Sequence, residues 1–384
     1  MTSPLPTPDD HALTRSRQLS TLIQAEIANA GGWLDFARYM HLALYAPGLG
    51  YYSGGARKFG KDGDFVTAPE ISPLFAQTLA RQAAQIIEAT LGDILELGAG
   101  TGRLAIELLL EMQRLDCVPA HYFILEVSAY LREIQHVQLE QALPPELLSR
   151  VQWLDTLPQT FSGLVLGNEV LDALSVHIVQ TKQQGFTEMG VAWDEGLVWA
   201  ERPLTTGYLY ELASKLALPV EYTTELCPAA TGLVASLAAM LQQGALLFID
   251  YGFPRREYYH PQRNRGTLMC HYRHYAHDDP FLYPGLQDIT AHVDFTAVAE
   301  AGVEHGLQLL GYCGQAQFLI NCSITELLTR VSPHDIAAYA LLASQAQKLL
   351  SPAEMGELFK VIALGKGLLG DLLGFARGDK RQIL

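Results

Sequence analysis

Three alternating glycines after an apolar segment are the residues of this chain that most clearly indicate chemistry. The apolar segment contains Glu96 and is followed by Gly98, Gly100 and Gly102, directly before a helical pattern. A strand that turns this tightly into a helix needs residues that tolerate unusual backbone angles and let a ligand approach closely. The helix N-terminus then presents free N–H groups and a partial positive charge to an anionic group. The pattern therefore predicts a nucleotide-type binding site.

The spacing of the glycines narrows the kind of nucleotide. Dinucleotide fingerprints read G-x-G-x-x-G, whereas the third glycine here comes one residue early and Glu96 stands two residues before the first. This pattern resembles motif I of class I S-adenosylmethionine (SAM) methyltransferases, whose loop holds the methionine part of the cofactor. An ordinary strand–helix turn is the alternative explanation of the glycines, and motif I taken alone leaves NAD binding open.

Two further acidic residues follow short apolar segments that read as strands. Glu126 ends the segment that begins at His121, and Asp155 ends the segment that begins at Val151. In a doubly wound sheet, Glu126 lies beside the glycine loop and can accept both hydroxyls of an adenosine ribose, while Asp155 can contact adenine. The alternatives are a solvated charge at Glu126 and a turn cap at Asp155. Three strand-end acids in register after a glycine loop favour a SAM site.

A polar segment ahead of residue 73 carries a second group of candidate cofactor ligands. Asp64, Thr67 and Glu70 crowd together with Ser72 in a short segment that also contains a proline. We expect this segment to be a loop whose hydrogen-bonding groups contact the cofactor. N-capping by Ser72, with Pro73 at the first helical position, explains only the end of the segment.

The segment from Asn168 to Asp172 follows an apolar strand and carries candidate catalytic groups, namely Asn168, Glu169 and Asp172. Glu169 and Asp172 are three residues apart, so on a helical turn they share a face. Paired carboxylates can clamp a guanidinium and keep electron density on an attacking nitrogen. Methyl transfer from a sulfonium needs little else, because in-line positioning supplies much of the rate. The alternative is that Asn168 caps a short helix with Glu169 in its first turn.

The segment of residues 253–292 is rich in histidine and aromatic residues. It contains neither a Cys-x-x-Cys pair nor a His-Glu-x-x-His spacing, so we expect no metal site. A lid or a wall of the substrate site fits this composition better. His292 is the fourth candidate catalytic residue, because it could orient an acceptor or relay its proton. Asp294 is expected to cap the helix that follows.

Composition limits the class of protein. A chain of 384 residues can form a large α/β domain with an added subdomain. Five scattered cysteines fit a reducing compartment. The net charge of −15 argues against nucleic-acid binding, because phosphate neutralisation needs clustered Lys and Arg. The N-terminus lacks signal-peptide and transit-peptide patterns, and no window approaches the roughly 20 apolar residues of a membrane span, so we expect a cytoplasmic protein.

The elements that must position these residues follow from hydrophobic periodicity. Residues 1–90 read as a helical N-terminal cap and residues 91–384 as the catalytic domain, an α/β fold whose strand–helix alternation predicts a doubly wound, parallel sheet. The period changes to two over residues 175–205, which predicts an antiparallel insert, and residues 253–292 form a second insert. After Phe375 we expect a frayed tail.

These segments together resemble the MidA-like SAM-dependent methyltransferases, the family that includes the mitochondrial complex I assembly methyltransferase. The segments that carry the resemblance run in order across most of the chain: GDFVTAPE (63–70), ELGAGTG (96–102), LEVS (125–128), NEVLDAL (168–174), IDYG (249–252), GTL (266–268), HDDP (277–280) and DITAHVDF (288–295). The resemblance implies a class I Rossmann-like core with a helical cap and inserted elements. It also implies SAM as the cofactor and methylation of an arginine in a protein, such as a respiratory complex I subunit.

This chain departs from the family pattern at a few positions. Family members often carry Pro at Ala99 and Phe-Phe at Val170–Leu171, and the absence of a transit peptide indicates a bacterial cytoplasmic relative. We expect a protein substrate, no nucleic acid and no stable membrane association, and a homodimer is left open. The alternatives are a small-molecule or other-residue methyltransferase on the same core, or a non-catalytic SAM-binding assembly factor.

Overall fold

The computed structural model describes residues 5–54, 67–332 and 334–384. The chain forms two compact units. Unit 1 comprises Met1–Phe65, Asp172–Ala230 and Arg255–His292, and unit 2 comprises Val66–Leu171, Thr231–Pro254 and Val293–Leu384. Unit 1 thus combines the N-terminal segment with most of the residues expected as inserts. Among the described residues, no helix is long and apolar enough to cross a membrane.

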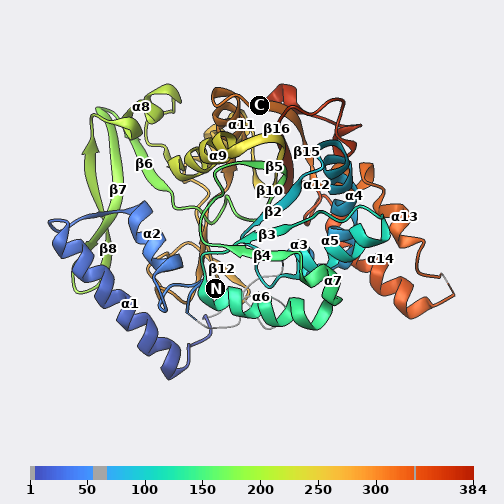
Figure 1. Cartoon of the computed structure of the whole chain (residues 1–384). Coiled ribbons are helices and arrows are strands. Elements are labelled where there is room, and N and C mark those ends of the chain that lie inside the picture. The colour runs from blue at the N-terminus through green and yellow to red at the C-terminus, as the bar shows by residue number, and fades with distance from the viewer. Residues whose placement is uncertain (1–4, 55–66, 333) are drawn as a thin grey trace. The chain divides into compact units, whose positions relative to one another are not determined.

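A mostly parallel sheet forms the centre of unit 2, in the order β15-β16-β10-β5-β2-β3-β4 (Figure 1). Its strands are β2 (Asp93–Leu97), β3 (Tyr122–Leu125), β4 (Val151–Leu154), β5 (Phe161–Asn168), β10 (Leu241–Phe253), β15 (Gln308–Gly314) and β16 (Phe359–Lys366), and β14 (Val293–Asp294) pairs with β10. Strand β16 runs antiparallel to both of its neighbours, whereas β10, β5, β2, β3 and β4 are mutually parallel. The predicted doubly wound α/β sheet is confirmed.

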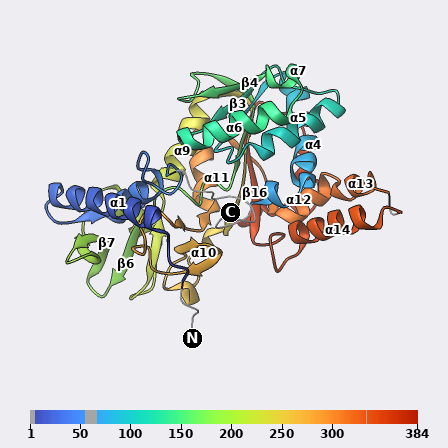
Figure 2. The same cartoon turned by 90° about the horizontal axis from the view of Figure 1, so that it is seen from below.

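Helices cover both faces of this sheet. The apolar face of α4 (Pro73–Thr90) joins the core that contains Ala245, Leu247 and Ile249 of β10. Gly302 of α11 (Phe295–Glu304) approaches Leu364 of β16, whose neighbour along the strand belongs to the α4 core, so α11 lies on the opposite face. The other helices are α3 (Ala68–Ile71), α5 (Arg103–Arg114), α6 (Ala129–Ala142), α7 (Pro145–Leu148), α9 (Pro228–Met240), α12 (Gln315–Asn321), α13 (Ile324–Leu328) and α14 (Ile336–Leu350). Figure 2 shows α12 and α14 side by side.

Unit 1 contains an antiparallel sheet and a smaller sheet of short strands. The first has the order β1-β7-β6-β9, with β8 beside β7, and the second has the order β12-β11-β13. Their strands are β1 (Leu34–Asp35), β6 (His177–Lys182), β7 (Gly185–Trp193), β8 (Leu197–Leu204), β9 (Thr223–Leu226), β11 (Met269–Tyr272), β12 (Tyr275–His277) and β13 (Asp288–Thr290). The period-two pattern correctly predicted β6, β7 and β8, whereas β1 and β9 are too short to show a period.

Two helices of unit 1, α1 and α2, begin at acidic caps. Asp9 accepts a hydrogen bond from the Ala12 N–H at the start of α1 (Asp10–Asn29), and Asp35 accepts one from the Arg38 N–H at the start of α2 (Phe36–Tyr45). The remaining helical elements are α8 (Tyr208–Lys215), α10 (Arg255–Tyr258) and the short 3₁₀ helix η1 (Pro261–Arg263).

The C-terminal tail was expected to fray after Phe375, and this prediction is wrong. The Lys380 N–H donates to the Tyr312 carbonyl oxygen at 2.6 Å, and Asp379 accepts from the Tyr312 N–H at 3.1 Å. These bonds satisfy backbone groups of β15, and two 3₁₀ helices, η2 (Leu373–Phe375) and η3 (Arg381–Ile383), shape the tail. The sequence did not indicate that the tail is ordered, because the tail is short and has little apolar periodicity.

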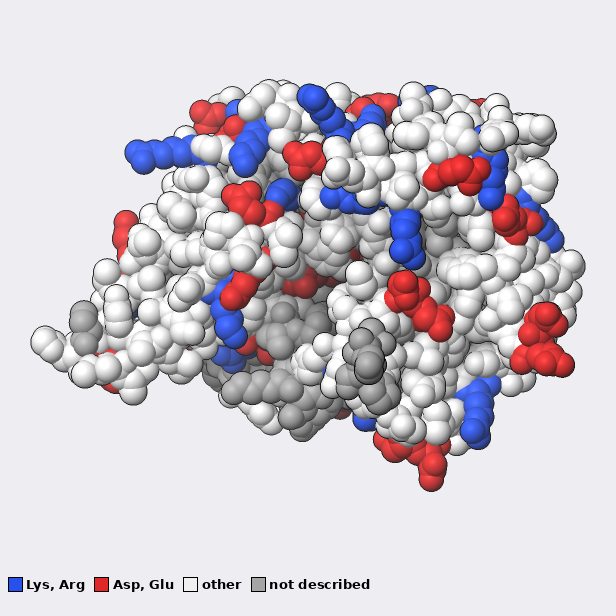
Figure 3. Space-filling model, turned by 180° about the vertical axis from the view of Figure 1, so that it is seen from behind, with Lys and Arg blue, Asp and Glu red and all other residues white. Residues whose placement is uncertain are grey.

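Charged side chains are mixed on the surface. On the face shown in Figure 3, Lys and Arg side chains are interspersed with Asp and Glu. Interspersed charges give no extended basic surface on that face, which is the electrostatic arrangement expected from a net charge of −15.

Candidate functional site

The glycine loop after β2 has the backbone geometry expected from its sequence. Gly98, Gly100 and Gly102 have φ angles of +61°, +56° and +85°, a region that favours glycine. Gly98 is exposed, whereas Gly102 is buried at the start of α5, where an added Cβ would lie 2.5 Å from Leu139 Cδ1. The loop therefore leaves backbone open at Gly98 and packs tightly at Gly102.

Glu96 lies in β2, two residues before Gly98, and is almost fully buried. Its carboxylate accepts a hydrogen bond of 2.7 Å from the Tyr122 hydroxyl, which joins β2 to β3. Burial raises the pKa of Glu96 to about 7; the bond from Tyr122 opposes this shift and the nearby Glu126 adds to it. Glu96 thus fixes the strand from which the glycine loop departs.

Glu126 and the glycine loop are connected by a residue that the sequence did not point to. The Gln135 side-chain amide donates to the Gly100 carbonyl oxygen at 2.9 Å and to Glu126 Oε2 at 3.1 Å, and it accepts from Trp153 Nε1 at 2.9 Å. Gln135 is fully buried on α6. The sequence did contain an indication: Gln135 is a polar residue spaced four residues from both Leu131 and Leu139, on the buried face of this helix.

The two other strand-end acids differ in their surroundings. Glu126 is 5% exposed and accepts from the Ser128 N–H at 2.8 Å, and burial raises its pKa despite that bond. The Asp155 side chain is 89% exposed and pairs with Arg132 at 2.8 Å. Glu126 therefore lies in the same buried network as the loop, and Asp155 lies in a surface ion pair.

The polar segment before α4 is described only in part. Asp64 lies outside the described residues, and Thr67 is the N-cap residue of α3. Glu70 accepts a hydrogen bond of 2.5 Å from the Thr101 hydroxyl, so the structure brings Glu70 to the glycine loop. Ser72 caps α4 by accepting from the Leu74 N–H, as its sequence position indicated.

The backbone turns sharply at the end of β5. Glu169 has a φ of +53°, which is uncommon for a residue other than glycine and is often found at functional sites. Its Oε1 accepts from Asn168 Nδ2 at 3.1 Å and from the Ala68 N–H at 3.4 Å. The expected helical turn from Asn168 is not formed, because a left-handed residue cannot continue a right-handed helix.

Asp250, at the end region of β10, holds this turn and was missed as a site residue. Its Oδ2 accepts from the N–H groups of Val170 and Leu171 at 3.1 and 2.8 Å, and its side chain is 1% exposed. The signal was present, because Asp250 follows a run of apolar residues in the sequence, as Glu126 does.

The remaining two candidate catalytic residues belong to unit 1. The Ala291 N–H donates to the Asp172 carbonyl oxygen at 3.1 Å, so the segments of Asp172 and His292 run together there. The His292 N–H donates to the Thr267 hydroxyl at 3.1 Å. Burial, together with the nearby charge of Arg263, lowers the pKa of His292 to about 4. Asn168 and Glu169 belong to unit 2.

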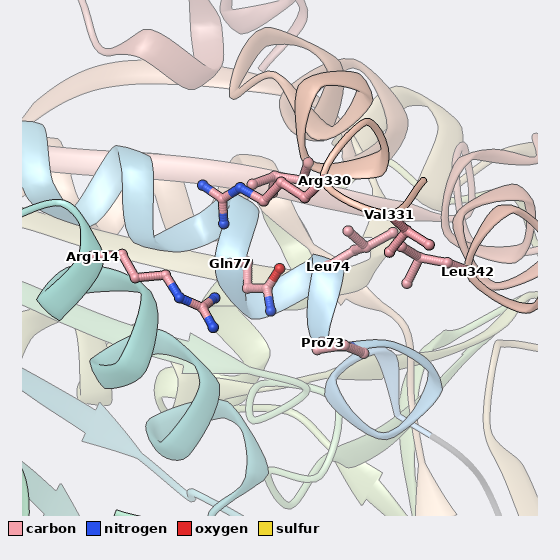
Figure 4. Close-up of a pocket in the computed structure, with 8 residues that line it drawn as sticks. Pro73, Leu74, Gln77, Arg114, Arg330, Val331 and Leu342 are labelled. Atoms are coloured by element: carbon pink, nitrogen blue, oxygen red, sulfur yellow. The ribbon is translucent and has the colours of Figure 1, made fainter. Parts of the chain in front are cut away.

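A pocket of about 310 Å³ lies elsewhere in unit 2 (Figure 4). It is lined by Pro73, Leu74, Gln77, Arg114, Leu327, Arg330, Val331 and Leu342. Arg330 binds the buried Glu111 through two hydrogen bonds of 2.7 Å, and Arg114 pairs with the same carboxylate at 3.2 Å. These arginines therefore stabilise the packing of α5 against the segment after α13, and none of the candidate site residues lines this pocket.

Known proteins are similar to this chain in sequence and in structure. Residues 78–313 match the family model described as "Putative S-adenosyl-L-methionine-dependent methyltransferase". The chain is 28% identical over 393 residues to the mitochondrial protein arginine methyltransferase NDUFAF7 homolog of Drosophila melanogaster, covering 91% of this chain and 85% of that protein. It is 29% identical over 373 residues to mitochondrial NDUFAF7 of Mus musculus, covering 87% and 81%.

A crystal structure of a Burkholderia thailandensis protein bound to S-adenosyl-homocysteine is also similar. It has a TM-score of 0.96 and 51% sequence identity, and the match covers 99% of this chain and 100% of that chain. A native crystal structure of a protein from the same organism gives a TM-score of 0.93 at 51% identity. This similarity extends over the residues of both units.

Proposed function

Because the chain belongs to the MidA-like family of SAM-dependent methyltransferases, we propose that it methylates an arginine side chain of a protein substrate. The enzyme class and the cofactor, SAM, follow from the family and from the similar structure with bound S-adenosyl-homocysteine. The arginine is supported by the curated relatives, which are named protein arginine methyltransferases. We propose a respiratory complex I subunit as the substrate, because the family includes a complex I assembly methyltransferase.

We propose that SAM is held by the glycine loop and by Glu126. The exposed backbone at Gly98 would admit the methionine part, and Glu126 would accept the ribose hydroxyls. The fit is supported by Gln135, which fixes the Glu126 carboxylate relative to the Gly100 carbonyl. When bound, SAM supplies a methyl group activated by a positively charged sulfur. Glu70 would support the loop through Thr101.

Glu169 is the observation that carries the catalytic part of the proposal. It occupies a strained backbone conformation beside Val170, whose Cγ2 would lie 3.4 Å from a Cβ placed on Gly98. We propose that its carboxylate, oriented by Asn168, accepts a hydrogen bond from the acceptor guanidinium and so keeps electron density on the attacking nitrogen. Asp172, a residue of unit 1, is a second candidate carboxylate.

His292 would have a different role. Because its pKa is lowered to about 4, the imidazole is neutral at physiological pH and can exchange hydrogen bonds with an acceptor without adding charge. We therefore propose that His292 orients the acceptor, whereas proton removal depends on the carboxylates.

The decisive experiment is incubation of the purified protein and labelled SAM with a lysate from a strain that lacks this protein. Methylarginine in a labelled protein band would support the proposal, and Glu169→Gln should abolish that label. Label in metabolites alone, or on a residue other than arginine, would contradict it.

A further inference from the structure

One face of β13 in unit 1 carries buried polar side chains. Asp288 is 3% exposed and Thr290 is 2% exposed, and residues two apart on a strand point to the same side. The opposite side of β13 carries Ile289, which is paired with Cys270 and belongs to the apolar core of unit 1. The polar side chains therefore lie on the face of β13 opposite Ile289. Burying polar groups costs free energy unless they form hydrogen bonds.

Tyrosines of the N-terminal segment lie against this polar face. The Tyr52 hydroxyl donates to Asp288 Oδ1 at 3.0 Å, and the Tyr52 ring stacks on Tyr45 with centroids 5.4 Å apart. The Tyr45 hydroxyl donates to the carbonyl oxygen of Ala173, the residue after Asp172. Tyr52 is thus connected to Asp288 directly and to the Asp172 segment through Tyr45.

The titration of Tyr52 supports this placement. Its pKa is raised well above 10, first by burial and then by the charges of Asp288, Tyr45 and Asp172. Both carboxylates therefore act on one phenol. Asp172 itself is 6% exposed.

Thr290 provides an independent observation. Its hydroxyl is buried and makes no hydrogen bond in the part of the chain that the structure describes. A buried hydroxyl without a partner is unfavourable, and native structures rarely keep one without a ligand, water or functional reason. Since it shares a face with Asp288, it points into the same polar region.

We infer that Asp288, Thr290 and Tyr52 form, together with Asp172, the binding site for the guanidinium group of the acceptor. This inference rests on the proposed function and assigns residues of unit 1 to substrate recognition. A guanidinium has five N–H donors in a planar fork and no acceptor. A carboxylate offers about four lone-pair positions, so Asp288 can accept from Tyr52 and from a guanidinium together.

The aromatic rings beside this site also discriminate between cations. The stacked rings of Tyr45 and Tyr52 provide a flat surface, and planar guanidinium groups stack on such rings, whereas a lysine ammonium is a compact, strongly hydrated charge. The site therefore favours arginine over lysine.

The test is a direct binding measurement on the full-length protein with ethylguanidinium as the probe and ethylammonium as the comparator. We expect wild type to bind ethylguanidinium more tightly, and Asp288→Asn to weaken that binding by roughly tenfold, as expected for the loss of a charge-assisted bond. Thr290→Val and Tyr52→Phe should each weaken it by about two- to fivefold. The matched control is Glu201→Gln, which removes one charge from an exposed ion pair with Lys182 in the same unit.

Equal binding of ethylguanidinium to wild type and Asp288→Asn would overturn the inference, as would an equal loss in Glu201→Gln. If Asp288→Asn does not fold, as judged by thermal unfolding, Thr290→Val and Tyr52→Phe decide, and wild-type affinity in both would overturn it. Binding that depends on Asp288, with no methylarginine formed in the lysate, would contradict the proposed reaction and leave this site standing. Methylarginine formed alongside binding independent of Asp288 would contradict the site alone.

Discussion

The Leu171 N–H donates a hydrogen bond of 2.8 Å to Asp250, an acid that is 1% exposed. Asp250 comes from β10 and Leu171 from the turn after β5, and these two strands are parallel neighbours. The candidate catalytic turn is therefore held by a side chain that need not touch substrate. Its conformation depends on the carboxylate of Asp250, which makes Asp250 a positioning residue.

We expect Asp250→Asn to lower kcat at least tenfold while the Kd for SAM stays within about twofold, because an amide replaces one acceptor oxygen by a donor that faces backbone N–H groups. The free energy of unfolding should fall by roughly 1–3 kcal/mol. The measurements are methylation kinetics, calorimetry with SAM and denaturant unfolding. Asp335→Ala removes the helix-capping carboxylate of α14 and should lower the free energy of unfolding by roughly 1 kcal/mol without changing kcat. Unchanged kcat in Asp250→Asn would contradict the positioning role.

The conformation of Glu169 predicts opposite effects on stability and activity. At a φ of +53°, Glu169→Gly removes a steric cost and should raise the free energy of unfolding by up to ~1 kcal/mol, although it loses the bond from Asn168. The same variant should have no measurable methylation activity. Glu169→Gln keeps the side-chain shape and should be inactive without the gain in stability. A Glu169→Gly protein that is active, or clearly less stable, would contradict this account.

Glu126 and Asp155 show how much of the candidate site could be predicted from the sequence. Both were predicted by the same rule, an acid after a strand, and the rule correctly located the edge of the sheet. It could not separate them, because the difference lies in contacts with other elements: Asp155 is exposed and pairs with Arg132 of α6. Gln135 was missed for the same reason, since its three partners come from three segments that are far apart in the sequence.

Local backbone conformation was the other limit. Spacing alone suggested a helical turn after Asn168, whereas the turn is set by the left-handed Glu169 and by Asp250. Strands β5, β10 and β16 of the central sheet were predictable because their apolar runs are long and mostly buried. The bonds that order the tail through Asp379 leave no periodic signal.

Gln135→Leu should weaken SAM binding by tenfold or more, because it leaves the Gly100 carbonyl, Glu126 and the Trp153 indole N–H without their shared partner. The loss would be seen by calorimetry with SAM at a temperature where the variant is folded. Gln138→Leu, at an exposed position of the same helix, is the matched control and should bind SAM as wild type does. A similar affinity in both variants would show that Gln135 does not shape the cofactor site.

The raised pKa of Glu96 predicts a specific pH dependence of stability. The folded protein holds a proton on Glu96 up to about pH 7, whereas an exposed Glu in the unfolded chain loses it near pH 4.5. Folding therefore binds a proton between these values, so the Glu96 contribution to stability is complete below the lower value and falls as pH rises to the upper one, by roughly 3 kcal/mol in total.

His292 changes stability in the opposite direction. Because its pKa is lowered from 6.5 to about 4, its contribution is present above pH 6.5 and is lost as pH falls. Single variants separate the two groups. We expect Glu96→Gln to remove the decline of the free energy of unfolding between about pH 5 and 7, measured by urea denaturation at closely spaced pH values. His292→Gln, the comparison variant, should steepen that decline. Parallel pH profiles of the free energy of unfolding in Glu96→Gln and wild type would contradict this prediction. They would show that Glu96 is already ionised in the folded protein below pH 7.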